Sequence, residues 1–330
     1  MEYGFTLNCD WISFTWNPVD DIIFESDNRS IIELFLLRFP EFQKKEFTVL
    51  EHGGFHYSKR IDLANDIMIL YDDADSIQKK GVYVQTPSHG LATLFALFGY
   101  NNLRDFLIDI YDRGAKVSRF DLAFDDYIKT YNPMDYMNFW INGQFKSHFR
   151  RYEFSGGSNG GSMFALGNRG SNKYLRIYDK SAESKGEKDC IRYEFELKGY
   201  DADKICRLYC DDIAFDFSDF IFSMFQIVEN TSDHHKCRRN MDSDWELWVK
   251  SQVSRINDID IPTEFTPVSY ERSYNWFVKQ CGSTLAKIWH CEGDDWLDNF
   301  LEQSLLHLKD KDLKIIKDVL SYKKYYEKVG

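Results

Sequence analysis

The 330-residue sequence has few of the features that mark membrane, secreted or zinc-binding proteins. It has no apolar run near the roughly 18 residues that cross a bilayer, and its N-terminus, Met1–Gly4, has no basic segment before an apolar one. The seven cysteines are scattered, odd in number and without a Cys-x-x-Cys pair. We therefore expect a cytoplasmic protein with reduced thiols and no membrane partner.

Positive charge is also scarce, because 41 Lys and Arg stand against 53 Asp and Glu, a formal net charge of −12. Affinity for duplex DNA comes largely from counterion release by basic side chains. The charge therefore argues against a protein that coats DNA nonspecifically. It remains compatible with a nucleic-acid enzyme that combines a local basic groove with a cluster of acids.

One group of side chains has the residue types of a zinc site but an irregular spacing, namely Cys206, Cys210, His234, His235 and Cys237. Reduced, unliganded thiols are the preferred interpretation.

Hydrophobic residues make up 43% and aromatic residues 17% of the chain, as expected for a folded, aromatic-rich protein. Alternating and helical patterns are mixed up to residue 200, and helical patterns dominate afterwards. We predict a catalytic domain over 1–200 and a mainly helical region over 201–330, which could also pack on the same sheet.

Three segments with a strand period carry the residues of greatest interest. In 173–180, Leu175 and Ile177 face one way, and the opposite face carries Tyr174, Arg176, Tyr178 and Lys180. In 116–127, Asp121 and Asp125 share the face opposite Phe120, Leu122 and Phe124. In 191–198, Glu194 and Glu196 alternate with apolar residues, beside Arg192 and Lys198.

Together these residue types predict a metal-assisted attack of a phenol on a phosphodiester. A phenol has a pKa of about 10, so forming the phenolate at neutral pH costs on the order of 4 kcal/mol. A divalent cation held by Asp121, Glu194 and Glu196, with Asp125 nearby, would reverse the unfavourable local field. Hard oxygen ligands suit Mg²⁺ or Mn²⁺.

Cations near this site are expected to hold the DNA. Arg176 and Lys180 would hold phosphate oxygens and favour the phenolate of Tyr178 as catalytic residues. The attack would leave a 5′-phosphotyrosine and a free 3′-hydroxyl. The predicted DNA contacts are Arg119, Lys146, Arg150, Arg151, Arg169, Lys173 and Arg192.

Three segments, Ser118–Asp126, Leu166–Glu183 and Ile191–Gly199, resemble in order and spacing the replication initiation factor family. That family includes rolling-circle initiators of plasmids and filamentous phages and relaxases of integrative elements. The resemblance covers residues 5–200 clearly and continues more weakly through Trp276–Ala286.

The resemblance implies an α+β fold with an antiparallel, sheet-centred nicking domain related to the His-hydrophobic-His endonucleases. Acids replace the histidine ligands, and this chain contains no His-x-His. The family's catalytic tyrosine, in an Arg-Ile-Tyr-x-Lys segment, falls on Tyr178 rather than Tyr174. Asn168 stands where the family has Ser in a Gly-Ser-Arg turn.

The function expected from both arguments is that of a rolling-circle replication initiator that nicks single-stranded or hairpin origin DNA. Its partners would include a host helicase and polymerase, and a homodimer is compatible. Two alternatives stay open at this point: a DNA-binding regulator on the same fold that does not nick, and a metal nuclease in which water attacks.

Overall fold

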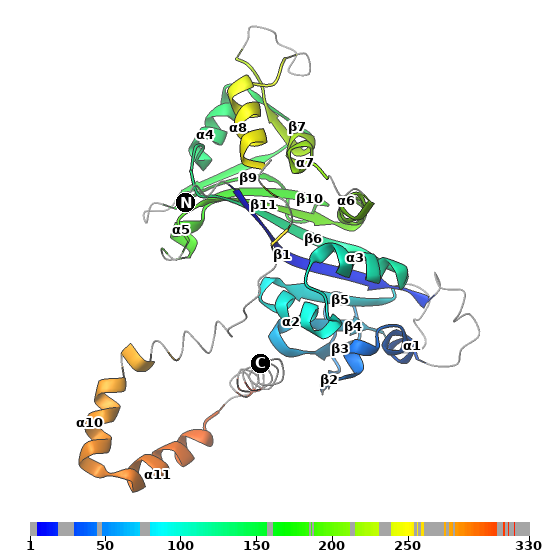
Figure 1. Ribbon diagram of the computed structural model, residues 1–330. Coiled ribbons are helices and arrows are strands. Elements are labelled where there is room, and N and C mark those ends of the chain that lie inside the picture. The colour runs from blue at the N-terminus through cyan, green and yellow to red at the C-terminus, as the bar shows by residue number, and fades with distance from the viewer. Residues whose placement is uncertain are drawn as a thin grey trace.

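The computed structural model describes residues 5–18, 30–44, 48–72, 80–156, 161–184, 186, 188–211, 215–230, 239–253, 256, 259–260, 274, 277–279, 281–308, 313, 316 and 320. Its centre is a ten-stranded antiparallel sheet with the strand order β2-β3-β4-β5-β1-β6-β11-β10-β9-β8 (Figure 1). A second sheet pairs β12 with β7. The α+β class and the antiparallel, sheet-centred architecture expected from the sequence are confirmed.

The described strands are β1 Phe5–Trp16, β2 Thr48–Leu50, β3 Lys59–Asp62, β4 Met68–Tyr71, β5 Val82–Pro87, β6 Ala115–Asp126, β7 Phe145–Ser147, β8 Tyr152–Gly156, β9 Ser162–Gly167, β10 Lys173–Asp179, β11 Ile191–Lys198 and β12 Phe225–Ile227. The described helices are α1 Ile31–Arg38, α2 Ser88–Phe98, α3 Leu103–Asp112, α4 Pro133–Ile141, α5 Lys180–Glu183, α6 Gly199–Asp211, α7 Phe217–Met224, α8 Ser243–Val253, α10 Gly282–Glu292 and α11 Asp294–Leu305. Short 3₁₀ turns cover Pro40–Lys44 and Ala64–Asp66.

Local sequence explains where several helices begin. The Asn132 side chain accepts hydrogen bonds from the first turn of α4, Asp135 returns one to the backbone of Asn132, and Pro133 occupies the first turn. Ser30 and Glu33 form the same reciprocal cap before α1. These caps satisfy backbone N–H groups that a helix start leaves without partners.

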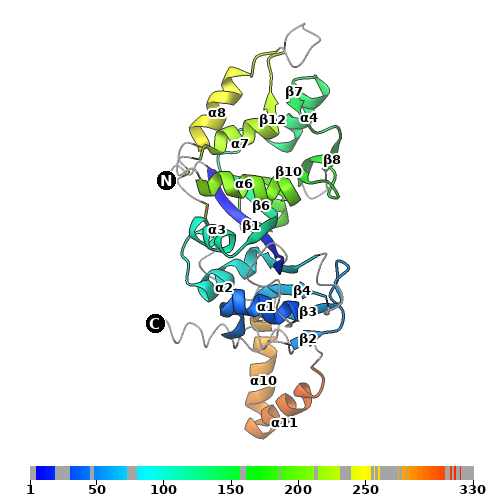
Figure 2. The ribbon, with the colours of Figure 1, turned by 90° about the vertical axis from the view of Figure 1, so that its right-hand side faces the viewer.

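Helices cover one face of the large sheet, which we call the helical face. Alternate side chains of β6 and β11, such as Phe124 and Phe195, are fully buried there. Phe220 of α7 contacts both rings, with centroid distances of 6.4 Å to Phe124 and 5.0 Å to Phe195. Helix α6 lies along β6 and β11 (Figures 1 and 2). Helices α6 and α7, both beyond residue 200 or next to it, therefore share one core with the sheet.

The opposite face of β6, β10 and β11, which we call the polar face, carries acids, cations and tyrosines. It includes Asp121, Asp125, Tyr178, Arg192, Glu194 and Glu196, all buried. The register pairs Glu196 with Asp121 and Arg176 with Glu194. Residues that pair directly across an antiparallel ladder lie on the same face.

Three segments differ from what their sequence pattern predicts: 47–57 reads as a strand, 87–90 as a turn and 215–228 as a helix. The strand over 47–57 is shorter, because β2 ends at Leu50 and Gly54, Phe55 and His56 have positive φ, which an extended chain does not adopt. The helix expected over 215–228 ends at Met224, and the next residues form β12. The turn expected at 87–90 is instead the start of α2.

Helices α10 and α11 differ from the rest because no residue in either is buried. The sequence pattern predicts helices over 269–289 and 295–326, the region in which α10 and α11 fall. Residues 261–267, whose sequence predicts a rigid connection, lie outside the described residues.

The shared core makes a stability prediction. Phe220→Ala should lower the free energy of unfolding by about 3–5 kcal/mol, because it leaves a cavity between Phe124 and Phe195. Leu247→Ala, at a side chain that is 68% exposed, should change it by less than about 0.5 kcal/mol. Urea denaturation of both variants measures the difference. Equal losses would show that α7 is not part of the sheet's core.

Candidate active site

Tyr178 is the tyrosine of the polar face whose hydroxyl contacts a carboxylate. Its hydroxyl donates a hydrogen bond to Oε2 of Glu194 at 3.0 Å, and the side chain is 9% exposed. The guanidinium of Arg176 binds the other oxygen, Oε1, of Glu194. Burial, with the charge of Glu194 adding to it, raises the pKa of Tyr178 well above its usual value. The phenol is therefore protonated at neutral pH, and its proton points to a carboxylate.

A second carboxylate group lies next to this pair along β11. Asp121 and Glu196 face each other, and Nη2 of Arg119 lies 2.6 Å from Asp121 and 3.3 Å from Glu196. Lys198 Nζ lies 2.5 Å from the other oxygen of Glu196. Burial raises the pKa of Asp121 to about 7, with Glu196 and Glu194 adding to the rise and Arg119 opposing it. The acids are thus too close and too buried to be fully charged without a cation.

Asp125 and Arg192 form a separate ion pair. Nε and Nη2 of Arg192 lie 2.6 and 2.7 Å from the two oxygens of Asp125, which is 0% exposed. Nη1 of Arg192 binds Asp10. Both oxygens of Asp125 face a guanidinium, which does not fit the expected metal contact. Arg192 is 5% exposed, which does not fit the expected contact with DNA.

Asp10 is a member of this acidic region that alternation along β1 does not reveal. Cys9 pairs with Leu122 and Trp11 with Asp121, so Asp10 is the extra residue of a β-bulge. A bulge turns the side chain away from the direction that strict alternation predicts. Burial raises the pKa of Asp10, with Arg192 opposing the rise and Glu194 adding to it.

Lys180 lies near the tyrosine but not on the strand. β10 ends at Asp179, whose side chain caps α5, and Lys180 is the first residue of that helix. Its Nζ lies 5.7 Å from the centre of the Tyr178 ring and 2.6 Å from Glu183. Lys180 thus contributes positive charge beside the ring from a helix rather than from the same strand face.

The acids have the donor chemistry for a divalent cation but not the arrangement that would hold one. Among the residues that the structure describes, no group of three or more His, Cys, Asp or Glu side chains is arranged to hold a metal ion. The donor chemistry nevertheless fits, because Asp121, Glu194 and Glu196 present only oxygen atoms from adjacent positions of one face. Arg119 and Arg176 now occupy their oxygens, so an ion could enter only if these cations moved away.

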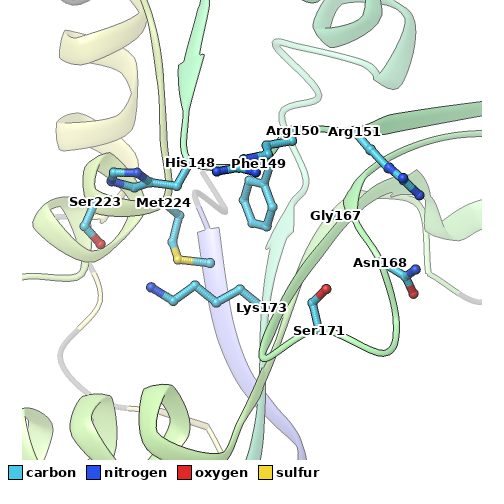
Figure 3. A pocket seen from close by; sticks show the side chains of 10 residues that line it. All are labelled: His148, Phe149, Arg150, Arg151, Gly167, Asn168, Ser171, Lys173, Ser223 and Met224. Atoms are coloured by element: carbon cyan, nitrogen blue, oxygen red, sulfur yellow. The ribbon is translucent and has the colours of Figure 1, made fainter.

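The other expected cations lie elsewhere. Lys173 alternates with Tyr174 and points to the helical face, where a cavity of about 400 Å³ gathers Arg150, Arg151 and Lys173 (Figure 3). Lys146 lies on β7 and Arg169 in the turn between β9 and β10. The expected groove beside Tyr178 is therefore not formed by these residues. Of the zinc-type group, His234, His235 and Cys237 lie outside the described residues.

The fold has a solved counterpart. The rolling circle replication initiator protein of Geobacillus stearothermophilus superimposes with a TM-score of 0.62 over 78% of this chain and 100% of that chain, at 18% identity. At that identity the likeness shows a shared fold. The chain therefore shares a sheet-centred fold with that protein.

The family is shown by sequence. The model described as replication initiation factor matches residues 115–303, more than half of the chain. A protein of Bacillus subtilis (strain 168), whose assignment as the DNA relaxase NicK is itself provisional, is 24% identical over 307 residues, or 87% of this chain and 80% of that protein. This chain belongs to the replication initiation factor family, as the motifs predicted. Within the described residues, no helix has both the length and the apolar character needed to cross a bilayer.

The raised pKa of Asp121 predicts a pH-dependent stability. The pKa of the Asp121 carboxyl is 3.8 in the unfolded chain and about 7 in the folded protein. Between these two pH values the carboxyl is protonated in the folded state and ionised in the unfolded state. The contribution of Asp121 to the stability of the fold is therefore full below pH 3.8 and is lost as the pH rises through about 7.

Asp121→Asn should remove this decline, so that the variant loses less stability than the original protein between pH 4 and 7. Thermal unfolding at several pH values measures it. Glu153→Gln, at an exposed carboxyl of β8, is the matched control. If Asp121→Asn and the control had the same pH profile, the carboxyl at 121 would not be protonated in the folded protein.

Proposed function

We propose that this protein nicks one strand of a replication origin and remains joined to the DNA through Tyr178. The observation that carries the proposal is the hydrogen bond from the Tyr178 hydroxyl to Glu194, on the sheet face that also bears Asp121 and Glu196. Family membership, the relaxase-like relative and the initiator fold support the same activity.

Glu194 is the group that would take the proton from the phenol. As the Tyr178 oxygen forms its bond to phosphorus, Oε2 of Glu194 accepts the hydroxyl proton, and the bond from phosphorus to the 3′ oxygen breaks. The leaving 3′ oxygen takes a proton from solvent water and becomes the free 3′-hydroxyl. The products are a 5′-phosphotyrosine and a 3′ end that a polymerase could extend.

Cations of the chain would balance the charge that develops in this step. Arg176 binds Oε1 of Glu194 and lies 5.7 Å from the centre of the Tyr178 ring, so it could reach the phosphate once a divalent ion replaces it on Glu194. Lys180 adds positive charge near the ring, with its Nζ 5.7 Å from the ring centre. Because the pKa of Tyr178 is raised, proton transfer and attack must occur together or with a further cation nearby.

Asp121, Glu194 and Glu196 would hold that further cation, Mg²⁺ or Mn²⁺. When bound, such an ion supplies positive charge next to the scissile phosphate. Arg119, released from Asp121 and Glu196, would then be free to bind a phosphate oxygen of the DNA. In this proposal Asp125 and Arg192 act through each other and hold β6 and β11 in register.

The DNA would be single-stranded or hairpin origin DNA, held away from the nick by unpaired cations. Lys146, Arg150, Arg151 and Arg169 make no ion pair with any residue that the structure describes, although the chain has a net charge of −12. Uncompensated cations in an acidic protein are suited to phosphates. A host helicase to open the duplex, and a second copy to complete the cycle, are compatible with the same proposal.

A covalent product tests the nucleophile. Wild-type protein incubated with origin DNA and Mg²⁺ or Mn²⁺ should give a protein–DNA adduct on a denaturing gel. Tyr178→Phe should abolish the adduct, and Tyr174→Phe, at the buried tyrosine opposite Glu196, should keep it. Cleavage that survives Tyr178→Phe would assign the attack to water. Binding without cleavage by the wild type would point to a regulator.

The base has its own test. Glu194→Gln should slow adduct formation by about 10²–10⁴-fold, because the amide cannot take the phenol's proton. The rate of the variant should recover as the pH rises, because hydroxide replaces the missing base. A rate close to the wild-type rate at neutral pH would exclude Glu194 as the proton acceptor.

Competition between Arg119 and a metal ion gives a prediction that does not depend on activity. Arg119→Met should tighten Mn²⁺ binding several-fold in titration calorimetry, because Asp121 then lacks its internal cation and Glu196 keeps only Lys198. Glu196→Gln should weaken it. Unchanged Mn²⁺ affinity in both variants would mean that these acids do not hold the ion.

A further inference from the structure

A cavity of about 400 Å³ lies at the end of the β9–β10 hairpin, on the helical face of the sheet. The loop before β8 supplies His148, Phe149, Arg150 and Arg151, β10 supplies Lys173, and α7 supplies Met224 (Figure 3). Its volume is within the range of about 300–1,000 Å³ that is typical of small-molecule sites.

The rim of this cavity carries positive charge that the protein does not neutralise. Arg150 and Arg151 are exposed and form no ion pair within the described part of the chain. The guanidinium groups of the polar face, such as Arg119 and Arg176, are by contrast each held by a carboxylate. Lys173 is shared with Asp201, at 3.1 Å. The rim is therefore suited to an anion, and a phosphate is the anion that Arg recognises best.

The floor of the cavity is apolar and aromatic. Gly167 has a φ of +90°, and a Cβ added there would lie 3.0 Å from the ring of Phe149. The glycine thus allows the ring to lie directly against the turn. Met224, 4% exposed, closes the other side, and the ammonium of Lys173 points toward it (Figure 3). An aromatic floor beneath a cationic rim matches a base attached to a phosphate.

The cavity cannot hold the nucleotide that is being cut. Lys173 and Tyr178 are on opposite faces of β10 and five residues apart, about 17 Å along the strand. A DNA strand that reaches both must pass either around the β9–β10 turn or around the sheet edge at β8. The nucleotide in the cavity would therefore belong to the flank of the nicked site.

We propose that this cavity takes one unstacked nucleotide of the bound DNA, with its base on Phe149 and the phosphates before and after it on Arg150 and Arg151, whose side chains point apart (Figure 3). The inference rests on the proposed function only in taking DNA as the ligand. Stacking on an aromatic side chain tolerates any base, so the cavity would recognise the extruded state of a nucleotide rather than its identity.

The test measures binding and not cleavage. The full-length Tyr178→Phe variant selects its tightest ligand from a random-sequence hairpin pool, and each base of that ligand is then removed in turn. At one nucleotide of the DNA hairpin, outside the part of the DNA that lies at Tyr178, loss of the base should weaken binding by about 5- to 150-fold. This is the range seen for base stacking on aromatic residues. In the double variant Tyr178→Phe, Phe149→Ala, removal of the same base should leave the affinity almost unchanged.

Two further variants make the test independent of folding problems at Phe149. Ser223→Trp, at an exposed position of α7 on the cavity wall, should fill the cavity and erase the same effect. Arg150→Ala with Arg151→Ala should lower the slope of log affinity against log salt concentration by about 2. Lys204→Ala, at an exposed cation of α6 outside the cavity, is the control and should leave the position of the responsive base in the DNA unchanged.

A flat profile of base removal would overturn the proposal, and so would a position whose response is unchanged by Phe149→Ala and by Ser223→Trp. A lower salt slope without any responsive base would also overturn it, because the cavity would then bind phosphate alone. Since these measurements need no nicking, a wild-type protein that fails to form the Tyr178 adduct would reject the proposed function and leave this result standing.

Discussion

Mutual neutralisation of carboxylates and guanidinium groups is the constraint on which the polar face depends. Asp121, Glu194 and Glu196 are each less than 8% exposed, and ionised carboxylates are costly to bury without a partner. Arg119 and Arg176 meet this cost on the two sides of β11. The cost of burial is not fully offset at Asp121, where burial raises the pKa to about 7.

The same balance makes the face responsive to a new cation. A phosphodiester would compete for the guanidinium groups, and a divalent ion would compete for the carboxylates. Exchange of partners would free Arg119 for DNA at the moment when the acids gain a stronger cation. The Arg192–Asp125 pair is less suited to such an exchange, because both oxygens of Asp125 are already bound and fully buried. A buried pair of this kind is costly to break, so it suits the task of fixing strand register.

Several features of the site follow from residue order alone. Alternation in 173–179 and 191–198 predicts that Tyr178, Glu194 and Glu196 avoid the core, and the register of β10 and β11 puts the first two in contact. The family motifs predicted the fold class. The placement of other site residues follows only from the three-dimensional structure. The bulge at Asp10 changes the side chain's direction without any change in hydrophobic pattern, and Lys180 leaves the strand because Asp179 caps a helix. The predicted DNA contacts group basic residues by sequence proximity, whereas strand parity puts Lys173 on the helical face, opposite Tyr178.

The sequence by itself determined the family, the strand period and the residue types that a nicking reaction requires, because these depend on local order. Tertiary structure alone decided which charges neutralise one another. In the folded protein Arg192 pairs with Asp125 and Arg119 with Asp121. Arg150 and Arg151, at a cavity on the other face, form no ion pair with a described residue. Charge pairing is a matter of distance across strands far apart in the chain, and no local pattern carries that distance.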